Sequence, residues 1–191
     1  MKIENKYIKL YTEMHQDDRT YQGVSLDKEI PNIANLVLTT SSITVLDYGC
    51  GKGNQYKQSN SNILFHILDE NLFLYDPAYK EHNTLPDRTF DGVISTDVLE
   101  HIPEEVIPKT LYQIFERAKK FVYLAICTRL ANAILPNGEN AHCTVKEPDW
   151  WEKHIIKSNK NKIHTEVHWY GNHNDYRKYY ISCLLYTSDA A

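Results

Sequence analysis

Three glycines follow a short, mostly apolar segment of the chain, residues 43–48, which carries one acidic residue near its end. The glycines are Gly49, Gly51 and Gly53, and the acidic residue is Asp47. Glycines after a buried strand allow a sharp turn and let a ligand approach the main chain closely. The spacing is G-x-G-x-G, so Asn54 occupies the place of the third glycine of a dinucleotide fingerprint. Asp47 has the wrong charge for a neighbouring pyrophosphate and suits a cationic group such as an ammonium.

Apolar periodicity along the chain predicts an α/β fold. Short apolar runs read as buried strands, and apolar residues at helical spacing read as amphipathic helices. The expected strands are residues 43–48, 72–75, 90–95, 121–126, 163–169 and 179–183. The expected helices are residues 5–14, 26–37, a crossover helix within 54–69, 104–120, and one that a capping box at Asp149 and Glu152 opens. Alternating strands and helices predict a mostly parallel sheet with helices on both faces, and a turn at 171–174 predicts a terminal antiparallel hairpin.

Three segments in this order resemble motifs of the class I S-adenosylmethionine-dependent methyltransferases. Residues 46–53 are similar to the family's glycine-rich first motif, Asp76 after residues 72–75 to its acidic ribose-binding position, and residues 90–102 to its fourth-strand segment. The resemblance spans roughly residues 20–183. It implies a Rossmann-like, seven-stranded sheet with an antiparallel last strand, and transfer of a sulfonium methyl group to a nucleophile. The residues that it assigns to the methyl donor are Asp47, Gly49, Cys50, Gly51, Gly53, Asp76 and Asp97.

The distance between two of these motifs agrees with the resemblance. Asp76 follows Gly53 by 76 − 53 = 23 residues, close to the roughly 20 residues typical of an acidic group that binds ribose. Two carboxylate oxygens can accept hydrogen bonds from two ribose hydroxyls. The structural alternative is an Asx turn before Pro77. Between Asp76 and Phe90, where the family has a short third strand, the sequence shows no clear strand.

Asp97, Glu100 and His101 follow the strand predicted at 90–95, where the mouth of an acceptor site is expected. Their D-x-x-E-H spacing resembles the metal motif of ubiquinone-biosynthesis and small-RNA 2′-O-methyltransferases, and such a set could hold a divalent ion at an acceptor hydroxyl. Relatives without a metal carry similar residues that shape the start of the next helix. The sequence favours this second interpretation, without a metal, and places Asp97 in the methyl-transfer pocket.

A long polar loop follows the strand predicted at 121–126. Loops on a rigid scaffold often carry specificity, so this one is expected to bind a small or polyhydroxylated acceptor, with His142 as general base. The candidate substrate-binding residues are Asn137, Glu139, Asn140 and His142. The alternative is a surface turn around Gly138. The polar loop favours O-methylation over N- or C-methylation.

The length and composition of the chain limit which folds and functions are possible. The 191 residues predict one domain at residues 1–184. Its expected parts are N-terminal helices at 1–40, a cofactor-binding half at 41–127 and an acceptor side at 128–184. Residues 185–191 are interpreted as a tail that is not native to the fold. With 42% hydrophobic and 24% charged residues and a net charge of −4, the chain is globular rather than disordered and lacks the strongly basic surface of a nucleic-acid binder.

Several expectations concern location and partners. No apolar run approaches the roughly 20 residues that span a bilayer, and the first residues contain no apolar core of an export signal, so a cytoplasmic protein is expected. Four cysteines without a C-x-x-C pair are expected to be reduced thiols. The expected partner is a small-molecule or glycan acceptor, not nucleic acid or membrane, and the oligomeric state is not predicted. One alternative is a regulatory subunit that binds the cofactor without catalysis. A second alternative, an NAD-dependent oxidoreductase, is less favoured, because Asn54 stands at the position of the third glycine of the dinucleotide fingerprint.

Overall fold

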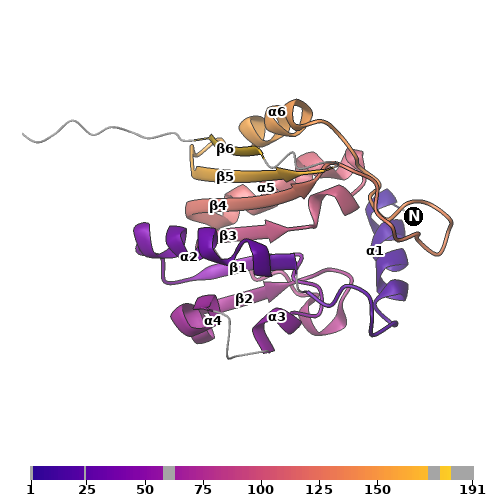
Figure 1. Ribbon diagram of the computed structural model, residues 1–191, viewed down its shortest axis with the longest axis horizontal. Coiled ribbons are helices and arrows are strands. Elements are labelled where there is room, and N and C mark those ends of the chain that lie inside the picture. Colours follow the sequence, from indigo (N-terminus) through magenta and orange to yellow (C-terminus); the bar gives the residue numbers. More distant parts are fainter. Residues whose placement is uncertain (1, 24, 58–62, 172–176, 182–191) are drawn as a thin grey trace, which may run out of the picture.

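The computed structural model describes residues 2–23, 25–57, 63–171 and 177–181. Six strands form one sheet in the order β2-β1-β3-β4-β5-β6 (Figure 1). The first five pair in parallel, and β6 pairs antiparallel with β5. The strands are β1 (Val45–Tyr48), β2 (Leu72–Tyr75), β3 (Phe90–Thr96), β4 (Ala118–Cys127), β5 (His164–Tyr170) and β6 (Arg177–Ile181). The predicted α/β class with a parallel, Rossmann-like sheet is therefore confirmed.

The strand count differs from the seven that the resemblance implied. Six strands lie in the part of the chain that the structure describes, and residues 76–89 contain a short 3₁₀ helix, Lys80–His82, in place of a strand. Two prolines and many polar residues leave this segment without the alternating apolar residues that a strand needs. The turn expected at 171–174 and Cys183 lie at least partly outside the described residues, so the terminal hairpin as a unit stays a prediction.

The helices depart from the expected ranges at their ends. They are α1 (Ile3–Met14), α2 (Ile30–Thr39), α3 (Asn54–Lys57), α4 (Ile63–Leu68), α5 (Ile107–Arg117) and α6 (Pro148–Ser158). Pro31 lies in the first turn of α2, where a missing N–H costs nothing, instead of kinking a longer helix. The helix expected to run to residue 120 ends at Arg117, and β4 begins at Ala118. The side chain of Asp149 makes no capping hydrogen bond, because Glu147 precedes the first turn of α6.

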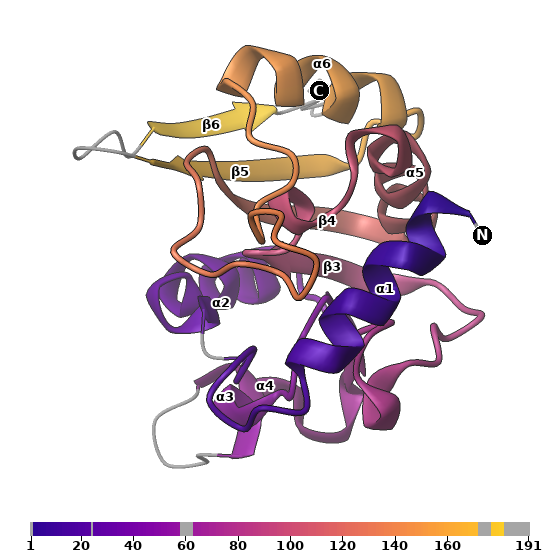
Figure 2. The same ribbon diagram turned by 90° about the vertical axis from the view of Figure 1, so that its right-hand side faces the viewer.

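Two cores form on opposite faces of the sheet, and Figure 2 shows α2 and α5 on these two sides. Strand β4 shows how one sequence serves both faces. Phe121, Tyr123 and Ala125 belong to the core with α2 and α4, whereas Val122, Leu124 and Ile126 belong to the core with α5 and α6. Successive side chains of a strand point to opposite faces, so a continuous apolar run is buried on both sides.

The carboxyl ends of the five parallel strands meet at one edge of the sheet, which is where ligands bind in open α/β folds. Helix α1 crosses this edge (Figure 2), and the long segment between β4 and α6 lies beside it. None of the helices in the described residues combines the length and the hydrophobicity that a bilayer-spanning segment requires.

Candidate active site

A cavity of about 600 Å³ lies at the carboxyl edge of the sheet. Its wall combines the glycine-rich loop, the ends of β2, β3 and β4, helix α1 and the segment after β4. The predicted residues that line it are Gly49, Gly51, Asp76, Asp97, His101 and His142. This volume lies in the range of small-molecule and cofactor sites, so one cavity joins some of the predicted donor residues to His142 of the predicted acceptor residues.

The glycine-rich loop follows β1 and is pinned to the end of β2. The backbone N–H groups of Gly49 and Cys50 both donate to the carbonyl oxygen of Tyr75, at 2.7 and 3.1 Å. Gly51 has a φ of +57°, and a Cβ atom there would lie 2.7 Å from the carbonyl oxygen of Tyr21. A side chain at this position would therefore be strained and would displace the neighbouring backbone.

Asp47 lies behind this loop and does not line the cavity. Its carboxylate is 1% exposed and accepts hydrogen bonds from the Tyr56 hydroxyl at 2.8 Å and from the Gln55 amide at 3.2 Å. Burial raises the pKa of Asp47 to about 7, against the lowering effect of these hydrogen bonds. Cys50 and Gly53 do not line the cavity either, so Asp47, Cys50 and Gly53 support the loop from within.

Asp76 lines the cavity beside the loop. Its Oδ2 atom accepts a hydrogen bond from the Gly51 N–H at 3.0 Å, and its Oδ1 atom accepts one from the Ala78 N–H at 2.8 Å. His15 lies nearby, with its Nε2 atom 3.9 Å from Asp76 Oδ1. Each carboxylate oxygen has two lone pairs, so both oxygens can accept a further hydrogen bond from a ligand.

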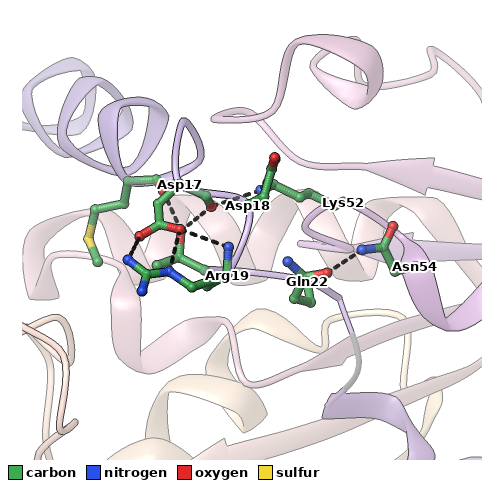
Figure 3. A network of polar contacts seen from close by, with 8 residues as sticks. Asp17, Asp18, Arg19, Gln22, Lys52 and Asn54 are labelled. Atoms are coloured by element: carbon green, nitrogen blue, oxygen red, sulfur yellow. Dashed lines mark hydrogen bonds and ion pairs between the residues drawn. The ribbon is translucent and has the colours of Figure 1, made fainter.

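The segment after α1 closes the outer side of the glycine-rich loop, a role that the sequence did not suggest. Figure 3 shows Lys52 reaching toward Asp17 and Asp18, and Asn54 bonded to Gln22. Lys52 Nζ donates to the carbonyl oxygen of Asp17 at 2.9 Å and lies 3.5 Å from a carboxylate oxygen of Asp18. These contacts hold two distant parts of the chain together at the mouth of the cavity.

Asp97 follows β3 and faces the cavity in a constrained conformation. Its φ is +57°, and its N–H donates to the carbonyl oxygen of Ala125 at 3.0 Å. Among the described residues, its buried Oδ1 atom has no hydrogen-bond partner. Burial, and then the negative charge of Glu29, raise the pKa of Asp97 to about 6. A carboxylate in this state is stabilised by a cationic ligand.

Glu100 is fully buried, whereas His101 lines the cavity, and the two do not form a group of metal-ligating atoms with Asp97 in the described part of the chain. Glu100 accepts a hydrogen bond from the Cys127 N–H at 3.0 Å, and His101 Nδ1 lies 2.8 Å from the carbonyl oxygen of Ala141. Burial is the main cause that lowers the pKa of His101 to about 3. In the described part of the chain, the group with metal-ligating atoms within 4.8 Å of one another is Glu100, Cys127 and His142, not the predicted alternative of Asp97, Glu100 and His101.

The polar loop after β4 is held by its own side chains. Glu139 forms an ion pair with Lys6 at 3.1 Å and accepts a hydrogen bond from Tyr7. Asn140 bonds to the backbone of Ala131, and the Asn137 side chain accepts from the Glu139 N–H. Asn137, Glu139 and Asn140 do not line the cavity, and His142 does. Of the four predicted acceptor residues, the structure places His142 at the cavity.

A family model described as a methyltransferase domain matches residues 25–177. The chain belongs to this family. No curated protein and no solved structure matches the chain significantly. Membership identifies the protein as an S-adenosylmethionine-dependent methyltransferase, with S-adenosylmethionine as the methyl donor that the family implies. The oxidoreductase alternative gains no support.

The methyltransferase has an aromatic cavity wall that the sequence did not reveal. Six tyrosines line it, namely Tyr7, Tyr11, Tyr21, Tyr48, Tyr75 and Tyr170. Two of them come from α1, where the helical spacing of Tyr7, Leu10, Tyr11 and Met14 predicted an amphipathic helix without showing what it covers. The Tyr11 hydroxyl lies 2.7 Å from the carbonyl oxygen of His101 and 2.8 Å from that of Ala141. Its single hydrogen is shared between these two acceptors, and this contact ties α1 to the acceptor side.

Proposed function

We propose that the cavity binds S-adenosylmethionine at the ends of β1 and β2, and a small acceptor at the ends of β3 and β4, where an acceptor oxygen is methylated. The observation that carries this proposal is the continuous wall that joins Gly51 and Asp76 to Asp97 and His142. We further propose that the acceptor is a small molecule rather than nucleic acid, and that the enzyme acts in the cytoplasm.

The donor side has the chemistry that a charged nucleoside requires. Asp76 keeps acceptor capacity for ribose hydroxyls after its bonds to Gly51 and Ala78. The buried Oδ1 atom of Asp97, which has no partner within the described ranges of the chain, would offer a negative charge to the ammonium or sulfonium end of the donor. In this arrangement Asp47 stabilises the loop and does not contact the ligand, which revises the role that the resemblance gave it.

The acceptor side supports a compact, partly apolar molecule. Tyrosine rings from α1 cover it, and the side chains of Asn137, Glu139 and Asn140 point into contacts within the protein. The three polar residues on which the expectation of a polyhydroxylated acceptor depended are therefore not available to bind it. His142 Nδ1 lies 2.6 Å from the carbonyl oxygen of Arg129. Because a carbonyl accepts, this contact places a hydrogen on Nδ1 and leaves the lone pair of Nε2 available for a proton.

Catalysis by this site is mainly positioning. The donor supplies a methyl group on a positively charged sulfur, which leaves as a neutral thioether. The residues that line the cavity would hold the acceptor next to that methyl group, and α1, which covers the acceptor side, would limit the access of water. Burial lowers the pKa of His142, so the imidazole is neutral at pH 7 and can take the proton of an acceptor hydroxyl as the oxygen is methylated.

Isothermal titration calorimetry with S-adenosylmethionine and with its demethylated product tests the donor site. Both should bind with one-to-one stoichiometry, and Asp76→Ala should weaken binding by about tenfold or more, since a charge-assisted pair of hydrogen bonds is lost. Asp87→Ala removes an exposed carboxylate from the segment between β2 and β3 and should leave affinity unchanged. Absence of heat with both compounds, in a folded wild-type protein, would contradict the proposed function.

A further inference from the structure

A glutamate, a cysteine and a histidine from three separate segments meet at the acceptor side of the cavity. Glu100 lies in the 3₁₀ turn Leu99–His101, Cys127 ends β4, and His142 belongs to the loop after it. One ligating atom from each lies within 4.8 Å of the other two. Cys127 and His142 line the cavity, and Glu100 is fully buried behind them.

We infer that Glu100, Cys127 and His142 form a binding site for one zinc-type divalent cation, with a fourth position open to the acceptor. This inference rests on the proposed function for the role of the cation, but not for its binding. The sequence offers no recognisable metal spacing, because 27 residues separate Glu100 from Cys127 and 15 separate Cys127 from His142.

The hydrogen bonds of the three residues leave each of them able to ligate. Glu100 Oε1 accepts from the Cys127 N–H, while Oε2, which is buried, has no partner in the described part of the chain. The Cys127 thiol donates a long hydrogen bond to the Arg129 carbonyl oxygen at 3.9 Å, which a thiolate bound to a cation would give up. The Nδ1–H of His142 donates to the same carbonyl oxygen, which leaves Nε2 with its lone pair, and histidine ligands of metals commonly donate their other N–H to a backbone carbonyl in this way.

A divalent cation matches the charge of the three ligand groups. A carboxylate from Glu100, a thiolate from Cys127 and a neutral imidazole from His142 together carry two negative charges, so one divalent ion gives a net charge of zero at the site. Asp97 faces Glu100 and adds negative charge, whereas the Arg129 side chain opposes it on the Cys127 side. His101, whose ring packs against His142, stays neutral.

The chemical nature of the three metal-ligating atoms determines which type of cation the site would bind. Thiolate and imidazole ligands favour Zn²⁺ and related transition metals, whereas Mg²⁺ and Ca²⁺ prefer oxygen alone. Three protein ligands with one side toward a cavity are typical of catalytic zinc sites, whose fourth position holds water or substrate. An acceptor hydroxyl in that position would lose its proton to solvent more readily. His142 Nε2 would then bind the cation instead of the proton, while the donor side of the proposed function is unchanged.

The test uses the full-length chain after removal of metals by chelator, titrated with Co²⁺ and Zn²⁺. One Co²⁺ per chain should bind at micromolar or lower concentration and give a thiolate-to-cobalt charge-transfer band in the near ultraviolet. Cys127→Ser should abolish this band, and Cys143→Ser, which changes a half-buried thiol outside the group, should keep it. Glu100→Gln and His142→Ala should weaken Zn²⁺ binding about tenfold to a hundredfold, and His154→Ala, a histidine also bonded to a carbonyl, should not.

A measurement on the wild-type protein alone tests the site even if some of the variants fail to fold. Zn²⁺ titrations at pH 7 in buffers of different ionisation enthalpy should show release of at least one proton per ion, because a cysteine thiol is largely protonated at pH 7 and binds zinc as a thiolate. Failure of one-to-one binding, a cobalt band that persists in Cys127→Ser, or release of no proton would each overturn the site. If the ion binds as expected but turnover is insensitive to chelator, its role toward the acceptor is wrong. Donor calorimetry on the metal-free protein separates these outcomes from failure of the proposed function.

Discussion

The acids of the donor side and those of the segment after β3, which borders the acceptor side, differ in how their oxygens are paired. The carboxylates of Asp47 and Asp76 each accept two hydrogen bonds from the protein. After β3, Asp97 Oδ1 and Glu100 Oε2 find no partner among the described residues. Buried polar groups are usually paired, and an unpaired one costs free energy. The protein therefore pairs Asp47 and Asp76 by itself, whereas Asp97 and Glu100 each have an oxygen left for a ligand.

The largest expected effect concerns the paired acid Asp47. Below pH 4 this group is protonated in both the folded and the unfolded protein. As the pH rises toward 7, the unfolded protein ionises while the folded protein keeps its proton, because burial holds the pKa at about 7. The free energy of unfolding therefore falls over this range, by up to about 4 kcal/mol for this group.

Urea unfolding from pH 4 to 7 measures this effect by comparing the wild type with Asp47→Asn. The amide keeps an oxygen for Tyr56 and does not ionise, so the variant should lose less stability as the pH rises. Parallel curves for the two proteins would show that Asp47 does not titrate in this range. The difference between the donor side and the acceptor side would then need another explanation.

Gly51→Ala tests how tightly the donor side is organised. A φ of +57° costs an alanine about 1–2 kcal/mol, and the new Cβ atom would lie 2.7 Å from the Tyr21 carbonyl oxygen. We expect the free energy of unfolding to fall by about 2 kcal/mol or more and donor affinity to fall with it. Gly138→Ala is the matched control, since its φ is +86° with open space around the added Cβ; an equal loss in both variants would show that backbone strain alone is responsible.

Asp97→Asn tests whether the unpaired acid receives the charge of the donor. The pKa of Asp97 is raised to about 6, so wild-type affinity for S-adenosylmethionine should increase as the pH rises through 6. The variant should bind about tenfold more weakly at pH 8, roughly 1.4 kcal/mol, and should lack this increase. Asp91→Asn changes an acid at the opposite end of β3. Calorimetry at several pH values should show an unaltered pH dependence for that control.

Tyr11→Phe removes the hydroxyl whose single hydrogen is shared between the carbonyl oxygens of His101 and Ala141 and ties α1 to the acceptor side. Because such a hydrogen bond contributes about 1 kcal/mol, the variant should raise KM for the acceptor severalfold and leave donor affinity unchanged. Thr12→Ala, which changes an exposed residue of the same helix, is the control. Equal losses of donor and acceptor binding in Tyr11→Phe would mean that α1 covers both sides alike.

The smallest effect is expected at the Lys6–Glu139 ion pair, whose side chains are both 43% exposed. Exposed pairs contribute about 0–1 kcal/mol. Thermal unfolding of Lys6→Ala should therefore differ from wild type by less than the difference found for Tyr11→Phe. A larger destabilisation would show that this contact, and not Tyr11, holds α1 over the cavity.

The sequence alone determined the parts of this methyltransferase that depend on local pattern. Apolar runs mark the strands, and the carboxyl ends of parallel strands share one edge, so Gly51, Asp76 and Asp97 had to lie near one another. A glycine-rich turn after a strand is equally local. An error arose where the local pattern is ambiguous, at Ala118, where a helix passes directly into β4. Between Asp76 and Phe90 the sequence showed no clear strand, and the structure agrees with the sequence rather than with the seven strands that the resemblance implied.

Only the tertiary structure decided which polar groups are satisfied and which face the cavity. The Glu139 carboxylate binds Lys6 and Tyr7 and does not line the cavity. Glu100 lies close to Cys127 and His142, although these residues are far apart in the sequence. Hydrogen-bond partners and ligand groups depend on how loops pack onto the sheet edge. This packing follows from contacts between residues far apart in sequence, which no spacing along the chain encodes.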